Sequence, residues 1–166
     1  MKDTSLVGAV FDCNVHLQAV AREKSVAAEC LRLVEKGLIR LYVSEEILAE
    51  VEDVLNRPEI RKHFQTLTDE IVEAFLLKLR NSARIVRRVP KKFNYSRDPD
   101  DEPYINLAAE IEADYLVSRD NDLLDLMTDY TLEAKEFRQK FRPLRVIEPL
   151  EFLKEMRDLE SKISPS

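Results

Sequence analysis

The sequence contains few of the residues that build several common kinds of functional site. Cysteine occurs only as Cys13 and Cys30, so we expect no disulfide scaffold, and a reducing compartment such as the cytoplasm fits. Neither of the two histidines has metal-ligand spacing to another histidine or a cysteine, which argues against a zinc site. Gly8 and Gly37 are the only glycines, so the chain lacks the phosphate-cradling loop of a nucleotide-binding Rossmann domain.

Long apolar runs are also missing. The run Leu6–Phe11 is among the longest; it is too short to span a membrane, and Asp12 ends it too early for a secretory signal. We therefore expect no membrane association. At 166 residues, with 45% hydrophobic and 35% charged residues, the chain fits a single globular domain over 1–166, with a C-terminal helix and tail at 148–166.

Positive charge is scarce as well. The formal net charge is −6, and an acidic protein is a poor non-specific binder of nucleic acid because the phosphates repel it. Segment 84–97 is the exception, since it carries six basic residues and no acid. Its simplest interpretation is a solvated edge. If the segment contacts RNA, the candidate residues are Arg87, Arg88, Lys91 and Lys92.

Apolar runs and helical patterns alternate along the chain. Strands are expected at 6–11, 38–43, 85–89, 115–118 and 144–147. Helices are expected at 17–37, 44–57, 60–64, 68–82, 103–111, 123–127 and 149–163, and 128–142 forms a helix-containing connection. Continuous apolar runs are typical of strands buried on both faces of a parallel sheet. The predicted fold is therefore α/β, a three-layer α/β/α sandwich with a mainly parallel central sheet.

Acidic residues recur where these elements begin or end. Asp12 directly follows the first strand, Glu50 lies on the helix after the second, and further acids flank the helix and strand between 101 and 118. Ligands of open α/β sheets bind at the carboxyl ends of the strands, and carboxylate oxygens suit Mg²⁺ or Mn²⁺. The candidate metal ligands are Asp12, Glu50, Asp101, Glu102, Asp120 and Asp122.

Most of these acids also have a purely structural interpretation. Asp101 or Glu102 could cap a helix, Asp120 and Asp122 could be loop acids or caps, and Glu50 could be a solvated helix residue. Asp12 is harder to explain in this way, because an acid next to a buried strand is costly without partners. The metal-site hypothesis therefore depends on the acids occurring together.

Three motifs, in order, resemble those of the PIN-domain nucleases. They are VFDCNV at 10–15, SEEILAEVEDVL at 44–55 and DPDDEPYINLAAEIEADYLVSRDNDLL at 98–124. The DPDD form is most similar to the VapC-type toxin components of prokaryotic toxin–antitoxin pairs. The resemblance implies Mg²⁺- or Mn²⁺-dependent cleavage of single-stranded RNA by water attack, leaving a 5′-phosphate. It also implies a homodimer and a small antitoxin protein that blocks the site.

Carried over by position, the resemblance assigns catalytic roles to Asp12, Glu50, Asp120 and a third acid. Spacing back from Asp120 favours Glu102 as that acid, although the family more often has Asp, and Asp101 is the neighbouring candidate. Asn14 and Ser118 would be supporting polar groups, and Asp122 would bind a second metal. Asp98 and Asp100 are assigned to the approach loop.

Three other functions compete with a toxin nuclease. A PIN-like fold could serve as an RNA-binding or complex-forming module without activity, or as an RNA-processing nuclease outside a toxin–antitoxin system. A phosphotransferase of the haloacid-dehalogenase type also uses an aspartate after the first strand. That class requires a second aspartate two residues later, where this chain has Asn14.

Overall fold

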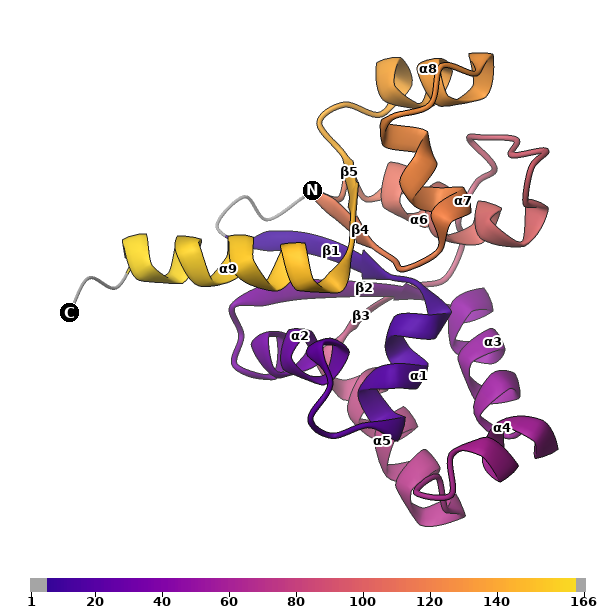
Figure 1. Ribbon diagram of the computed structural model, residues 1–166, viewed down its shortest axis with the longest axis vertical. Helices are drawn as coiled ribbons and strands as arrows, with labels where there is room; N and C mark the ends of the chain where they lie inside the picture. The colour runs from indigo at the N-terminus through magenta and orange to yellow at the C-terminus, as the bar shows by residue number, and fades with distance from the viewer. Residues whose placement is uncertain (1–5, 164–166) are drawn as a thin grey trace.

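The computed structural model describes residues 6–163 and contains a five-stranded parallel sheet (Figure 1). The strand order is β3-β2-β1-β4-β5, and every neighbouring pair is parallel. The parallel α/β sheet predicted from the apolar runs is confirmed. The strands are β1 (Val7–Phe11), β2 (Ile39–Ser44), β3 (Arg84–Val86), β4 (Tyr115–Val117) and β5 (Arg145–Ile147).

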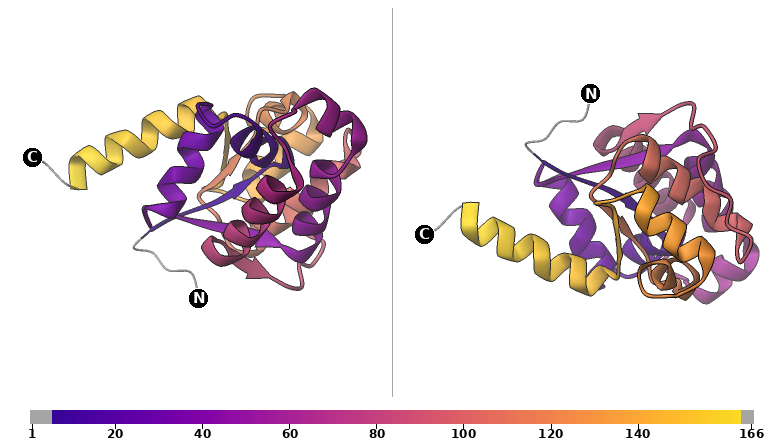
Figure 2. Two further views of the ribbon diagram at one scale, coloured as in Figure 1. Left: turned by 90° about the horizontal axis from the view of Figure 1, so that it is seen from below. Right: turned by 90° about the horizontal axis from the view of Figure 1, so that it is seen from above.

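Helices cover both faces of the sheet. In Figure 1, α1, α2 and α5 lie on one side and α6, α7 and α8 on the other, while α9 packs against α2 and its end extends beyond the sheet (Figures 1 and 2). The helices are α1 (Cys13–Ala21), α2 (Val26–Glu35), α3 (Glu45–Leu55), α4 (Pro58–His63), α5 (Asp69–Ser82), α6 (Glu102–Glu110), α7 (Asn121–Leu124), α8 (Leu132–Lys140) and α9 (Pro149–Ile163), with short 3-10 turns η1 (Pro99–Asp101) and η2 (Asp125–Met127).

The central strands explain the continuous apolar runs of the sequence. Val10 on β1 and Leu116 on β4 are paired in register, and both are fully buried. Because helices cover both faces, successive side chains of these strands all enter the core. None of the helices within residues 6–163 is long and apolar enough to cross a membrane. The single-domain organisation over 1–166 stays a prediction.

The first predicted helix is wrong in its extent, because the structure has two helices there. Asp12 caps α1, so that helix begins at Cys13, four residues earlier than expected. The chain then breaks at 22–25, and the Ser25 hydroxyl accepts a hydrogen bond from the Ala28 N–H at 3.1 Å to start α2. The capping residues Asp12 and Ser25 therefore start two separate helices where the apolar pattern alone predicts a single one.

Two further boundaries differ from the expected ones. The strand expected at 85–89 is only Arg84–Val86, because its partner β2 ends at Ser44, opposite Val86, leaving nothing further to pair with. The short helix expected at 60–64 begins earlier, because Pro58 stands at the first position of α4, where a missing N–H costs nothing. Ser44 caps α3, since its hydroxyl accepts from the Ile47 N–H at 3.0 Å.

Candidate metal centre

Asp12 lies at the carboxyl end of the central strand and is held by two hydrogen bonds. One carboxylate oxygen accepts from the Cys13 N–H at 2.7 Å and thereby caps α1, and the other accepts from the Ser118 hydroxyl at 2.7 Å. The residue is only 7% exposed. Burial raises its pKa, and these two hydrogen bonds partly offset that rise. Asp12 is therefore a buried acid in a fixed orientation.

Ser118 connects Asp12 to the acids that follow β4. Its side chain is fully buried, and its oxygen also accepts from the Asp120 N–H at 2.9 Å. Asp120 in turn caps α7, because its Oδ1 accepts from the Asp122 N–H at 2.9 Å. The structural role foreseen for Asp120 as a cap uses one carboxylate oxygen and leaves the other available to a ligand.

Asp101 lies at the end of η1, directly before α6, and is 6% exposed. Its Oδ2 is buried and has no hydrogen-bond partner within residues 6–163. Burial, followed by the negative charges of Asp120, Asp12 and Asp98, raises its pKa to about 9. An unpaired buried carboxylate oxygen is costly, and a bound cation would supply the missing partner.

Four acids from four segments of the chain meet in one pocket of about 430 Å³. Glu50, half-buried on α3, approaches from the side of β2, and burial raises its pKa while the neighbouring Tyr104 hydroxyl lowers it in part. Asn14 lies exposed on the pocket wall. We call this the acid pocket; its acids are Asp12, Glu50, Asp101 and Asp120.

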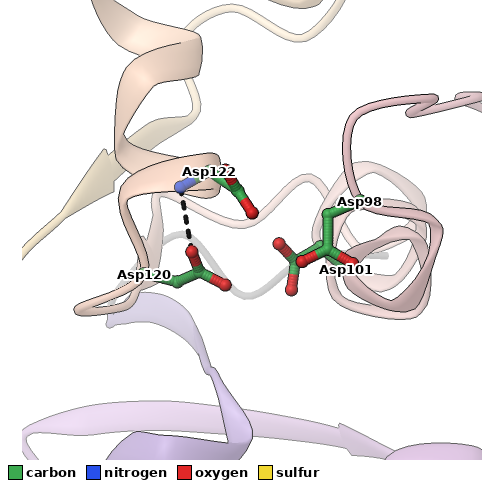
Figure 3. A group of neighbouring side chains, drawn as sticks. All are labelled: Asp98, Asp101, Asp120 and Asp122. Carbon is green, nitrogen blue, oxygen red and sulfur yellow. Dashed lines mark hydrogen bonds between the residues drawn. The ribbon is translucent and has the colours of Figure 1, made fainter.

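A second group of acids overlaps the acid pocket. Asp98, Asp101, Asp120 and Asp122 each place one carboxylate oxygen within 4.8 Å of the others. Figure 3 shows Asp120 and Asp122 on one side facing Asp98 and Asp101 on the other. We call this group the outer cluster. Asp98, which the sequence assigned to the approach loop, therefore lies with the metal-binding candidates; its place in the acid-rich DPDD run was the only signal.

Glu102 does not line the acid pocket. Its Oε2 accepts from the Tyr95 N–H at 2.9 Å, and its Oε1 lies 3.3 Å from the Lys91 ammonium. The Tyr95 hydrogen bond lowers its pKa, in contrast to the raised pKa of Asp101. Neighbouring residues at a helix start point about 100° apart, so only one of the two can face the acids. Spacing favoured Glu102 as the third acid; the geometry instead favours Asp101.

The donor set fits a divalent cation. All of the candidate ligand atoms are hard carboxylate oxygens, and two carboxylates about 4 Å apart repel by ~4 kcal/mol at an effective dielectric constant of about 20. Both that repulsion and the unpaired Asp101 oxygen are relieved when a cation binds. The site needs neither a cysteine sulfur nor a histidine nitrogen. Cys13 lines the pocket, but burial raises its thiol pKa to about 12, which disfavours the thiolate that a metal would bind.

Comparison with known proteins agrees with this geometry. Residues 8–122 match the PIN domain family, well over half of the chain and every acid of the pocket. The chain belongs to the PIN domain family. It is also 29% identical over 151 residues to the uncharacterized protein MJ1680 of Methanocaldococcus jannaschii, covering 90% of this chain and 91% of that protein. A PIN domain has the fold of a metal-dependent nuclease, which the acidic cluster at this edge of the sheet fits.

This PIN domain also contains site residues that the sequence did not single out. Arg119 is exposed at the mouth of the acid pocket, between Ser118 and Asp120. The buried Tyr104 hydroxyl makes no hydrogen bond of normal geometry within residues 6–163, and burial among Cys13 and Glu50 raises its pKa. The position of Arg119 inside the third motif could have indicated it, whereas Tyr104 looked like any apolar-face residue of a helix.

The basic residues proposed as RNA contacts lie elsewhere on the PIN domain. Lys91 and Lys92 pair with Glu102 and Glu110 at 3.3 Å, and both line a depression of about 650 Å³ near the C-terminal end of α6. Arg87 and Arg88 are exposed in the segment after β3 and line neither this depression nor the acid pocket. We call this the basic depression; its cations are Lys91, Lys92, Lys140 and Arg142.

Proposed function

We propose that this PIN domain is an endoribonuclease that uses Mg²⁺ or Mn²⁺ to cut single-stranded RNA. The observation that carries the proposal is the buried Oδ2 of Asp101, which has no hydrogen-bond partner within residues 6–163, in a pocket formed with three further carboxylates. A protein core tolerates such a group only when it is protonated or paired with a cation. The RNA preference and the single-stranded substrate are inferred from the motifs shared with the VapC-type family.

Asp12, Asp101 and Asp120 would hold the ion, with Glu50 at the pocket wall. When bound, the ion lowers the pKa of water and stabilises negative charge on a phosphodiester. Ser118 keeps Asp12 and the Asp120 backbone in register, so both ligands are oriented before substrate arrives.

The remaining pocket residues act on the substrate and the water. Arg119 at the pocket mouth would contact the phosphate flanking the cut, and Glu50 would take a proton from the attacking water at a carboxylate oxygen. Asn14 would orient that water. Attack of water on phosphorus breaks the bond to the 3′-oxygen, which takes a proton from solvent and leaves as a 3′-hydroxyl, and Glu50 then returns its proton to solvent. The products are a 5′-phosphate and a 3′-hydroxyl.

The test is cleavage of 5′-labelled single-stranded RNA by wild type, Asp12→Asn and Asp53→Asn, each with Mn²⁺ and with EDTA. Asp53 is an exposed acid on α3 that pairs with Arg57, so it controls for loss of one negative charge. We expect EDTA and Asp12→Asn to remove cleavage and Asp53→Asn to leave it. Cleavage that survives both EDTA and Asp12→Asn would exclude the metal mechanism.

A binding module without catalytic activity is the second candidate, because a net charge of −6 suits a protein partner better than a polyanion. No RNA cleavage in the same assay, with Mn²⁺ present, would favour that module, and RNA binding without cleavage would make it an RNA-binding one. Cleavage would exclude it.

The biological setting is a further part of the proposal. We propose a cytoplasmic toxin that acts as a homodimer and is inhibited by a small antitoxin protein, on the basis of the DPDD motif shared with VapC-type proteins. Growth arrest on expression, relieved by a co-expressed small protein from the same operon, is the expected result, with light scattering giving the mass of a dimer. Cleavage without growth arrest would indicate an RNA-processing nuclease instead.

A further inference from the structure

Arg97 sits among three carboxylates that belong to a different part of the chain. Its Nε lies 2.6 Å from Asp122 Oδ1, its Nη2 2.8 Å from Asp125 Oδ2 and its Nη1 3.4 Å from Asp129 Oδ2. All nitrogens of the guanidinium are therefore directed at acids on or beside α7 and η2. This is the densest set of ion pairs described within residues 6–163.

The two residues before Arg97 make contacts to the same region. The Tyr95 hydroxyl donates to the Asp122 carbonyl oxygen, and the Ser96 N–H donates to Glu133 Oε2 at 3.0 Å. Three consecutive residues thus attach this segment to α7, η2 and α8. Asp98 follows directly, so the attachment fixes one side of the outer cluster against the other (Figure 3).

Asp122 is the residue shared by the Arg97 ion pairs and the outer cluster. The outer cluster and the acid pocket have Asp101 and Asp120 in common, so the carboxylates could be divided between two cations. The outer cluster already has a positive charge beside it, the Arg97 guanidinium. A guanidinium paired with Asp122 Oδ1 neutralises part of the charge of the outer cluster and places a positive charge beside any ion that binds there.

We propose that Arg97 is a positioning residue whose guanidinium takes the place of a second metal ion, so that this protein binds one divalent cation, in the acid pocket. The inference rests on the metal site of the proposed function. Asp122, which the sequence placed among the metal ligands, is then a partner of Arg97. A second ion in the outer cluster would lie beside the Arg97 guanidinium and be repelled by its positive charge, which makes its binding roughly tenfold or more weaker than that of the first.

Mn²⁺ binding, followed by the loss of the free-ion electron paramagnetic resonance signal, tests this stoichiometry without RNA. The variants are Arg97→Gln, Arg97→Lys and, as a matched control, Arg145→Gln. Arg145 also pairs with an acid, Glu155, but lies at the opposite end of the sheet. We expect one tight Mn²⁺ in wild type, Arg97→Lys and Arg145→Gln. Arg97→Gln should bind two, because the positive charge beside the outer cluster is removed.

Two results would overturn the proposal: two Mn²⁺ ions of equal affinity in wild type, or only one in Arg97→Gln with an unchanged circular dichroism spectrum. Asp122→Asn gives an independent test that keeps Arg97. It should retain the single tight ion with its affinity within about twofold, whereas loss of that ion would make Asp122 a ligand and exclude our assignment. A wild type that binds one Mn²⁺ and cuts no RNA would refute the nuclease and leave this inference standing.

Discussion

The two ends of helix α6 place charge in opposite surroundings. At its start, the acid pocket holds carboxylates that are buried or half-buried, and Asp101 Oδ2 lacks any partner within residues 6–163. Near its end, the basic depression is larger, about 650 Å³ against about 430 Å³, but its lysines are exposed. Lys91 and Lys92 pair with Glu102 and Glu110, and the Lys140 ammonium donates to the Lys92 carbonyl oxygen. Pocket size and charge alone would favour the basic depression. The buried, unpaired Asp101 oxygen favours the acid pocket instead, because a bound ligand there can relieve the cost of burying it.

The sharpest test of this comparison uses the neighbours Asp101 and Glu102. Asp101→Asn removes a carboxylate from the acid pocket, and we expect kcat/KM for RNA cleavage to fall about 10³-fold, near 4 kcal/mol of transition-state stabilisation. Glu102→Gln removes only an acceptor for Tyr95 and Lys91, and we expect a change below about threefold. Steady-state kinetics with Mn²⁺ measures both, and the reverse order of effects would restore Glu102 as the third acid.

Metal binding should also raise the stability of the folded protein. An ion present at 100 times its Kd raises the free energy of unfolding by about 2.7 kcal/mol, which corresponds to roughly 5–10 °C in Tm for a chain of this size. Differential scanning calorimetry of wild type with and without Mn²⁺ should show that rise, and Asp101→Asn should lose most of it. Arg142→Gln, in the basic depression, should keep it; an equal loss there would mean that the ion's effect is not specific to the acid pocket.

His16 is another buried residue whose polar atoms lack partners. Both ring nitrogens are buried without a hydrogen-bond partner within residues 6–163, and the ring packs against Phe11 and Phe75. It lines neither the acid pocket nor the basic depression. Burial lowers its pKa to about 4 from 6.5, so the fold resolves this case by keeping the imidazole neutral.

A group that loses basicity on folding destabilises the native state as the pH falls. Above pH 6.5 the imidazole is neutral in both states, and between 6.5 and 4 only the unfolded chain gains the proton. Urea unfolding should therefore show that the His16 contribution lowers wild-type stability by about 2 kcal/mol at pH 5 relative to pH 7.5. His16→Leu should remove that part of the pH dependence, and the exposed His63→Leu should leave it. Equal pH profiles for wild type and His16→Leu would contradict this account.

The sequence was sufficient for the sheet and the place of the acids. Continuous apolar runs mark parallel strands, and acids directly after such strands converge at one edge, so Asp12 and Asp120 could be placed together. It could not decide between Asp101 and Glu102, because the short η1 turn sets the direction of both side chains. The Arg97 ion pairs were equally out of reach, since they depend on how the 95–101 segment folds over residues 122–129, far away in sequence.

The smallest expected effects concern RNA binding. They distinguish a basic side chain that contacts a phosphate directly from one that only attracts the RNA at long range. Arg119, exposed at the mouth of the acid pocket, has no ion pair described within residues 6–163, so we expect direct contact with a backbone phosphate. Arg119→Gln should weaken RNA binding about tenfold and reduce the slope of log K against log salt by about 0.7, the value for one contact to a single strand. The binding is measured with the inactive Asp12→Asn background, so that no substrate is consumed.

Lys92→Gln is the matched change in the basic depression, where the ammonium already pairs with Glu110 at 3.3 Å. An exposed pair of this kind is worth little and attracts RNA only at long range, so we expect a loss below about threefold at low salt that vanishes near 0.5 M, where screening is nearly complete. Fluorescence anisotropy across a salt series distinguishes the two variants. If Lys92→Gln instead lowers the salt slope as much as Arg119→Gln, the RNA strand reaches along α6 into the basic depression. The buried, unpaired carboxylate would then not be what distinguishes the RNA-binding end of α6 from the other end.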